Sequence, residues 1–226
     1  AAYKAVILSQ FGFGATIDFD DVSHKGITNI STDDVAVAQE LGYVIKLVGD
    51  VREVESGISA EVSPTFLPKN HPLASVNDVM NAVFVESIGI GESMYYGPGA
   101  GQKPTATSVL ADIIRIARRL SDGNVGKPFN EFHRDLPLAN PADVKSNYYF
   151  ALDTPDEKGK ILHLSEIFNS EDISFEQVLQ QKANGTTARI VVITHAMSKT
   201  QLQAVTEKLE AAEDFAVVNT LKVLSN

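Results

Sequence analysis

The C-terminal part of the sequence alternates between strand and helix patterns, and this alternation limits the fold more than any other feature. Four segments rich in β-branched residues are separated by two segments with apolar residues at helical spacing. In chain order they are strand 147–152, helix 159–169, strand 173–181, strand 189–194, helix 199–212 and strand 215–223. This βαββαβ order is that of a ferredoxin-like sheet, and we predict such a domain over residues 146–226.

The first 122 residues have a less regular pattern, which predicts a mixed or antiparallel sheet with helices. A helix is expected from Ile30 to Leu41, because Ser31 and Asp34 form a capping-box variant. The other expected elements are a helix over 1–13 and strands over 43–51, 58–66, 83–85 and 93–96. Glycine and proline punctuate the polar stretch that follows. We therefore expect an α+β protein with domains at 1–122 and 146–226 and a linker at 123–145.

A glycine-rich loop leads into a long amphipathic helix. Gly97, Gly99 and Gly101 stand at alternate positions and leave backbone N–H groups uncovered. Pro104 suits the first turn of the helix, and apolar residues behind it predict that the helix is packed. The loop is either a structural turn or a contact for a phosphate, because helix N-termini attract anions. The dinucleotide-binding fingerprint is incomplete, because Gln102 stands where a third glycine is needed.

The apolar residues of the first helix lie on nearly all of its sides, which predicts burial on several sides. Lys4 interrupts this apolar pattern. On a helical wheel it falls between Leu8 and Phe11. One interpretation is a lysine whose stem lies on the apolar surface while its ammonium reaches solvent. The other is a lysine in a cleft that serves as a proton donor.

Composition excludes several classes of protein. The chain has no cysteine, which excludes disulfide frameworks, and its five histidines lack metal-ligand spacing, so we predict no metal site. The net charge of −10 argues against binding to nucleic acid or to anionic membranes. The first residues lack the layout of a signal peptide and an initiator methionine. We expect a fragment of a cytoplasmic protein whose partners are small molecules or proteins.

Several motifs follow one another in the order of one enzyme family. They include Ala1-Ala2-Tyr3-Lys4, Gly26-Ile27, Glu40-Leu41-Gly42-Tyr43, Asn81-Ala82-Val83, and Tyr96 to Gly101 with Pro104-Thr105-Ala106. On these motifs the chain resembles the C-terminal part of the homoserine dehydrogenase family, with a catalytic and dimerisation domain in its first half. The resemblance implies NAD(P)-dependent interconversion of aspartate 4-semialdehyde and L-homoserine, in the biosynthesis of threonine, methionine and isoleucine.

The same resemblance assigns roles to residues. It implies that Lys4 donates the proton and that Gly97, Gly99 and Gly101 lie near the cofactor, NADP or NAD. It also implies a homodimer or higher homo-oligomer. Most contacts to the cofactor belong to an N-terminal domain of the family that these 226 residues lack. We therefore expect the fragment alone to be inactive.

Residues 147–226 resemble the ACT regulatory module of many bacterial members. This implies an amino-acid effector such as threonine, held by Asp153, Gly159, Lys160 and Ile161. Three charged residues, Asp156 to Lys158, lengthen the first strand-to-helix connection of the module, so we expect weak or absent threonine binding. A different class of function stays open: a stand-alone amino-acid-binding protein in which the first 120 residues serve only for oligomerisation.

Overall fold

A computed structural model describes residues 1–124, 126, 132–182 and 186–224, and the chain divides into two compact units. One unit, called the sheet unit below, comprises Ala1–Pro68 and Phe132–Asn226. The other, called the hairpin unit, comprises Lys69–Glu131. The units do not follow the predicted division at 122 and 146, because the sheet unit combines the two ends of the chain. That division stays a prediction about functional domains.

The C-terminal half of the sheet unit has the predicted order of elements. Its elements are β6 (Lys145–Pro155), α4 (Lys160–Asn169), β7 (Phe175–Lys182), β8 (Thr187–Thr194), β9 (Met197–Ser198), α5 (Lys199–Ala211) and β10 (Ala216–Val223). The main strands lie in the order β10-β6-β8-β7, and all neighbours in this series are antiparallel. The short strand β9, which was not predicted, pairs with the start of β6.

The N-terminal half of the sheet unit is built on a long hairpin. Its elements are α1 (Ala2–Phe13), η1 (Phe19–Asp21), β1 (Ser23–His24), α2 (Thr32–Glu40), β2 (Tyr43–Val54) and β3 (Gly57–Pro68). Strands β2 and β3 pair over their full length and turn at Glu55 and Ser56. Gly57 has a φ of 143°, and a Cβ at this position would overlap the backbone of Pro137. Glycine is therefore required where the hairpin begins its second strand.

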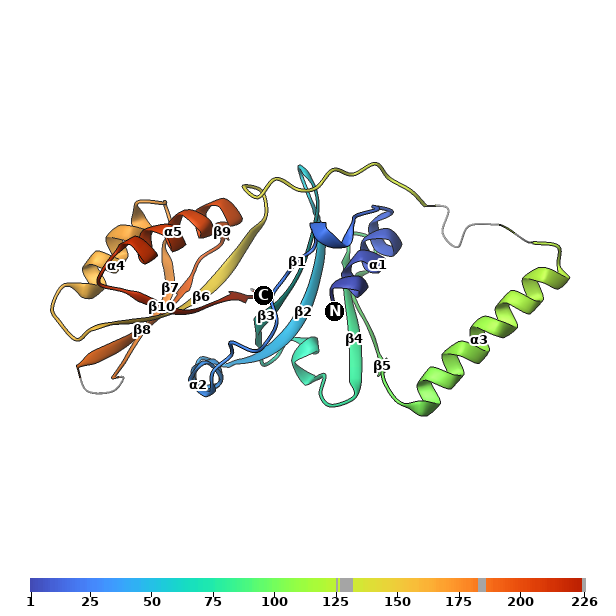
Figure 1. The fold of residues 1–226 in the computed structure, drawn as a ribbon, viewed down its shortest axis with the longest axis horizontal. Coiled ribbons are helices and arrows are strands. Elements are labelled where there is room, and N and C mark those ends of the chain that lie inside the picture. The colour runs from blue at the N-terminus through green and yellow to red at the C-terminus, as the bar shows by residue number, and fades with distance from the viewer. Residues whose placement is uncertain (125, 127–131, 183–185, 225–226) are drawn as a thin grey trace. The chain divides into compact units, whose positions relative to one another are not determined.

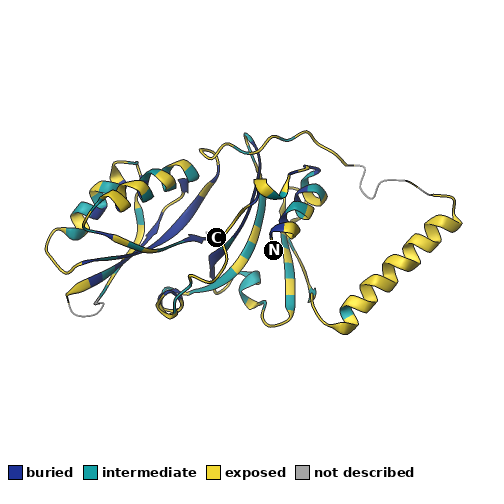
Figure 2. Ribbon diagram, in the orientation of Figure 1, coloured by how far each residue is buried: buried dark blue, intermediate teal, exposed yellow. Residues whose placement is uncertain are grey.

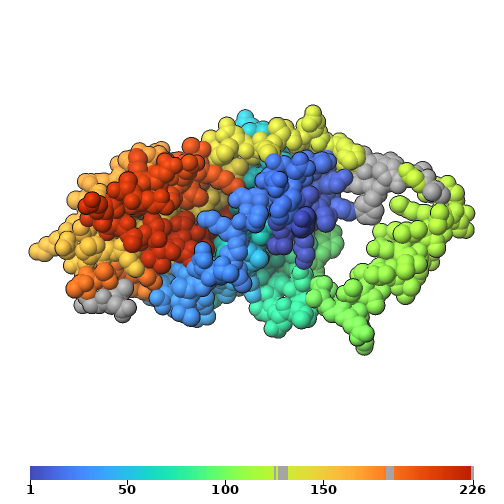
Figure 3. Space-filling model, in the orientation of Figure 1, coloured from blue at the N-terminus to red at the C-terminus, as the bar shows by residue number. Residues whose placement is uncertain are grey.

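Strand β3 joins the two halves into one mixed sheet (Figure 1). One edge of β3 pairs with β2, and the strand also pairs in parallel with β1 and with β10. The last strand of the chain therefore lies beside a strand that ends at Pro68. In the space-filling view the blue N-terminal part and the red C-terminal part of this unit meet (Figure 3).

Helices cover both faces of this sheet, because successive side chains of a strand point to opposite faces. Helices α4 and α5 pack on one face, where the core includes Phe150, Leu164, Phe168, Val205 and Leu209. Helices α1 and α2 pack on the other face, against residues of β3 and of the C-terminal strands. The strands between them are the most buried part of the unit, as β6 shows in Figure 2.

The hairpin unit contains η2 (Pro72–Ser75), β4 (Met80–Ser87), β5 (Gly91–Pro98) and α3 (Gln102–Ser121). The strands β4 and β5 form a separate two-stranded antiparallel sheet. Helix α3 begins after the glycine loop, as predicted, but no residue of this fully described helix is buried. Val109, Ile113 and Leu120 are each more than half exposed. Within the hairpin unit the apolar stripe is therefore not packed as predicted.

None of the helices in the described parts of the chain is both long and apolar enough to span a bilayer.

Candidate functional site

Lys4 lies on a helix that is held close to the sheet. The buried residues of α1 are Ala2, Ala5 and Ser9, which recur on one face of the helix. Their small side chains let the helix backbone lie close to β3, and Ala2 and Ala5 share a buried cluster with Ile58, Ala60 and Val62 of that strand. Ser9 Oγ donates a hydrogen bond of 2.9 Å to the Ala5 carbonyl, so this buried hydroxyl is satisfied within the helix.

The side of α1 that carries Lys4 is exposed, together with three large apolar residues. Tyr3 is 70% exposed, Ile7 54% and Phe11 49%. We expected burial on several sides of this helix, and the sheet unit buries only one. The ring of Tyr3 stacks on Phe19 at 4.5 Å between centroids. Lys4 therefore belongs to an apolar surface that is suited to contact with a ligand or with another polypeptide.

The C-terminal end of α1 is fixed by contacts to residues far along the chain. Gly14 caps the helix in the left-handed region with a φ of 69°. Its carbonyl accepts a bond of 2.9 Å from the Arg134 backbone N–H. The Arg134 guanidinium forms two bonds of 2.6 Å to the Glu53 carboxylate, and this pairing lowers the pKa of Glu53. The helix is thereby tied to strand β2.

The three glycines of the loop have different local environments. Gly99 lies against the side chain of Asn81, which a Cβ at this position would overlap. Gly101 has a φ of 121° and is the N-cap of α3, so a side chain there would be strained. Gly97 pairs with Asn81 in the β4–β5 hairpin, and no atom of the described residues beyond its chain neighbours lies within 4 Å of where a Cβ would be.

These environments bear on both interpretations of the loop. The positive φ of Gly101 and the close approach of Asn81 to Gly99 support a structural turn, whereas the space beside Gly97 leaves room for a ligand. Lys4 belongs to the sheet unit and the glycine loop to the hairpin unit.

The four residues predicted to bind an effector lie near the start of α4 but take part in separate contacts. Asp153 accepts two hydrogen bonds from Arg189, at 2.9 and 3.1 Å, which raise the pKa of Arg189. Lys160 Nζ is 2.9 Å from Asp214, and this bond raises the pKa of Lys160. Gly159 is the N-cap of α4 with a φ of 91°, and Ile161 is 42% exposed. Asp153 and Lys160 are thus already paired with other side chains of the same chain.

The charged connection before α4 has contacts of its own. The backbone N–H of Asp156 donates to the Thr186 carbonyl at 3.0 Å. The carboxylate of Glu157 lies 3.4 Å from Lys160 Nζ, although the Glu157 side chain is 68% exposed. The added negative charge therefore lies beside one of the predicted effector residues.

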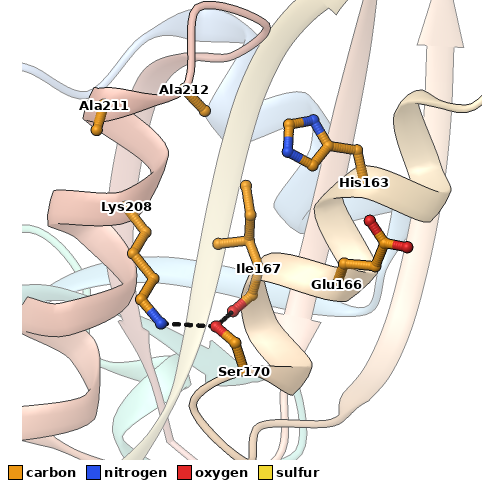
Figure 4. A pocket seen from close by; sticks show the side chains of 7 residues that line it. All are labelled: His163, Glu166, Ile167, Ser170, Lys208, Ala211 and Ala212. Carbon is orange, nitrogen blue, oxygen red and sulfur yellow. Dashed lines mark hydrogen bonds between the residues drawn. The ribbon is translucent and has the colours of Figure 1, made fainter.

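A groove of about 440 Å³ lies between α4 and α5 and contains none of the predicted site residues. Its lining residues are His163, Glu166, Ile167, Ser170, Lys208, Ala211 and Ala212 (Figure 4). Lys208 Nζ crosses the groove and donates to Ser170 Oγ at 2.7 Å. Sequence reasoning missed this groove, because the packing of two helices brings the residues together.

Comparison with known proteins gives a consistent result. The family model described as homoserine dehydrogenase matches residues 1–114. The homoserine dehydrogenase of Lactococcus lactis is 58% identical over all of this chain and 53% of its own length. That of Bacillus subtilis is 35% identical over 98% of this chain and 51% of its own length. The chain spans about half the length of the curated relatives it matches.

A solved structure also covers nearly the whole chain. The crystal structure of a homoserine dehydrogenase from Thiobacillus denitrificans superposes with a TM-score of 0.90 and 32% sequence identity. The match includes 99% of this chain and 52% of the crystallised chain. The arrangement of the chain is thus similar to about half of that protein.

Proposed function

The chain belongs to the homoserine dehydrogenase family, and on this premise we propose that it contributes to the interconversion of aspartate 4-semialdehyde and L-homoserine in the cytoplasm. This reaction serves the biosynthesis of threonine, methionine and isoleucine. The observation that carries the proposal is the presentation of Lys4 on an exposed apolar face of a helix whose other face is held on β3.

Lys4 has the chemistry that this reaction needs. When bound, NAD(P)H would supply the hydride that the carbonyl carbon accepts. Negative charge then develops on the carbonyl oxygen, and the Lys4 ammonium is suited to stabilise that charge and to donate a proton to the oxygen. In the reverse direction the neutral amine of Lys4 accepts the proton of the homoserine hydroxyl. Apolar neighbours such as Tyr3 and Ile7 would exclude water once this face is covered.

The glycine loop supplies a surface for the cofactor. NADP and NAD both carry a pyrophosphate, and the N–H groups at the start of α3 are suited to bind an anion. The open space beside Gly97 would admit the ligand, while Gly99 and Gly101 hold the turn that presents the helix. We propose that these three glycines lie near the cofactor and that most of its contacts come from outside the 226 residues.

An activity assay tests this proposal directly. The complete natural protein should oxidise L-homoserine with NAD or NADP, and the 226-residue chain by itself should not. If the complete protein does not catalyse this reaction, a second candidate function is favoured: an amino-acid-binding protein without catalysis. The observation behind that candidate is the strand order β10-β6-β8-β7 with two covering helices, which suits a regulatory module of the ACT kind.

We propose that the chain forms a homodimer in which the partner subunit covers the β4–β5 hairpin. An isolated two-stranded sheet is marginal in water, and this one exposes Val83, Val85 and Tyr95 on a single face. We expect light scattering to report a twofold dimer at micromolar concentration. Replacing Val83 and Tyr95 together by serine should shift the protein towards monomer. A wild-type monomer would contradict this assignment.

We propose that the C-terminal half is an ACT-like module that binds threonine weakly or not at all. A carboxylate near the start of α4 would meet Glu157, which lies beside Lys160. Like charges about 4 Å apart repel by about 1 kcal/mol in water and by more in a partly buried site. Calorimetric titration with L-threonine should give no saturating heat below millimolar concentration. The Glu157→Gln variant should bind more tightly if this repulsion is the cause.

A further inference from the structure

Five charged residues form a partly buried ion cluster where the two halves of the sheet unit meet. They are Asp50, Arg52, Glu61, Lys199 and Lys222, which come from β2, β3, the start of α5 and β10. We refer to them as the ion cluster. Lys222 is only 6% exposed and Glu61 only 9%.

Glu61 is the centre of this cluster. Its carboxylate binds Lys222 Nζ directly and lies 2.8 Å from Lys199 Nζ. Lys222 Nζ is also 2.5 Å from Asp50. Burial by itself would raise the pKa of Glu61, but the charges of Lys222 and Lys199 outweigh burial and lower the pKa to about 2. Glu61 is therefore ionised at neutral pH and links two lysines of the C-terminal half to β3.

The outer part of the cluster makes a second link between the halves. The Arg52 guanidinium lies 2.6 Å from Asp50 and donates to the Lys145 carbonyl and to Ser146 Oγ, each at 3.0 Å. Strands β2 and β6 are thereby connected on the same side of the sheet as Glu61.

Both lysines occupy positions that local structure disfavours. Lys199 is the first residue of α5, where the helix dipole is positive and a cation is unfavourable. Lys222 is a buried charge in the middle of a sheet, which is costly without a partner. The carboxylate of Glu61 compensates the charges of both lysines. The ion cluster therefore selects one docking position of the C-terminal half on the β2–β3 hairpin.

The same segment of β3 carries the helix of Lys4 on its opposite face. Ala60 and Val62, the neighbours of Glu61, pack in one cluster with Ala2 and Ala5 of α1. Side chains alternate along a strand, so a shift of the backbone at Glu61 moves the surface on which α1 lies. These contacts are between small side chains in a closely packed interior. The side chains therefore have little free volume in which to rearrange, and α1 would move with the strand.

From this geometry we infer that Glu61 is a positioning residue for Lys4 and that the C-terminal half holds it in place through Lys199 and Lys222. The inference rests on the proposed function of Lys4. It makes the C-terminal half part of the support of the active site, because the contact of Glu61 with α5 is on the reverse side of the strand that carries α1.

Turnover of the complete natural protein tests the catalytic part of the inference. We expect Glu61→Gln and Lys199→Gln each to lower kcat for homoserine about 10- to 100-fold, with KM changed less than about threefold. Glu171→Gln and Lys208→Gln are matched controls, because that pair joins α5 to the residues after α4 at 2.5 Å without touching β3. The double variant Glu61→Gln/Lys199→Gln should be no slower than Glu61→Gln, since the two residues act as a unit.

Hydrogen exchange of α1 tests the positioning part without relying on catalysis. Amides of residues 2–13 should exchange about tenfold faster in Glu61→Gln and Lys199→Gln, and at the wild-type rate in both controls. Lys199 keeps 27% of its side chain exposed, so its variant should fold even if Glu61→Gln does not. Unchanged exchange in α1 with faster exchange in α5 and β10 would overturn the inference. If the wild-type protein shows no turnover of homoserine, the proposed function is refuted. The hydrogen-exchange measurement of α1 still tests the positioning role of Glu61 in that case.

Discussion

Replacing Lys4 by alanine in the complete natural protein is expected to lower turnover of homoserine by about 10²- to 10⁴-fold, the usual contribution of a general acid. The thermal unfolding temperature should stay close to that of the wild type, because the Lys4 side chain belongs to the exposed face of α1. Binding of the cofactor should also persist, since the proposed role is proton transfer. Steady-state kinetics together with calorimetry would separate these effects.

Two further variants make this test specific. Lys4→Arg should also be inactive, because a guanidinium hardly releases a proton at any working pH. Lys25→Ala removes another exposed lysine of the sheet unit and should retain activity. Near-normal turnover of Lys4→Arg would exclude Lys4 as the acid and leave it at most an electrostatic role.

Replacing Asp34 by alanine is expected to lower the free energy of unfolding by about 3 kcal/mol, the sum of the lost capping-box bond to the Ser31 N–H and of buried donors left without partners. Asp34 is 1% exposed. Its carboxylate accepts hydrogen bonds of 2.9 Å from the Ser31 N–H, from the Tyr149 hydroxyl and from Asn219 Nδ2. It thereby fastens the start of α2 to both β6 and β10. Chemical denaturation would measure the loss.

The neighbouring residue is a suitable control for this effect. The Asp33 side chain is 71% exposed and pairs with Arg189 at 3.2 Å. The Arg189 side chain is only 15% exposed, but it keeps its two hydrogen bonds to Asp153 when Asp33 is removed. An ion pair with so exposed a carboxylate contributes about 1 kcal/mol or less, so Asp33→Ala should have a small effect. An equal loss of unfolding free energy in the two variants would show that the buried hydrogen bonds of Asp34 contribute no more than the exposed ion pair of Asp33.

The pH dependence of the Asp34 contribution has a definite sign. Burial by itself would raise the pKa of Asp34, but hydrogen bonds from Ser31, Asn219 and Tyr149 outweigh burial and lower the pKa below 3.8. The folded state therefore binds this proton more weakly than the unfolded state. The stabilisation is complete well above pH 3.8 and is lost as pH falls through the lower pKa of the folded state. The difference between wild type and Asp34→Ala should shrink over that range.

Asp34 also shows which contacts can be predicted from sequence. Its capping bond to Ser31 spans three residues and was predicted, because the spacing of the capping box is local. Its bonds to Tyr149 and Asn219 span 115 and 185 residues. Nothing in the spacing of these residues indicates that they meet, because the contact depends on the docking of one sheet half on the other.

The candidate site divides in the same way. Lys4 and the glycine loop were proposed from motifs along the chain, and the positive φ of Gly101 agrees with a turn before a helix. Glu61 was not identified, because a lone acidic residue in a strand pattern has no distinguishing neighbours. Its importance depends on Lys199 and Lys222, which the sequence places far from it.

The order and type of the longer helices and strands followed from the sequence itself, since periodicity, caps and turn residues act over a few neighbours. The short strands β1 and β9 did not, because two residues carry no periodic pattern. The tertiary structure alone decided that β10 pairs with β3, that α1 and α4 cover opposite faces of one sheet, and that the hairpin unit does not cover the apolar face of α3. An apolar strand or helix face carries the requirement to be covered but not the identity of its partner, because hydrophobic attraction is non-directional and backbone pairing is the same for every sequence.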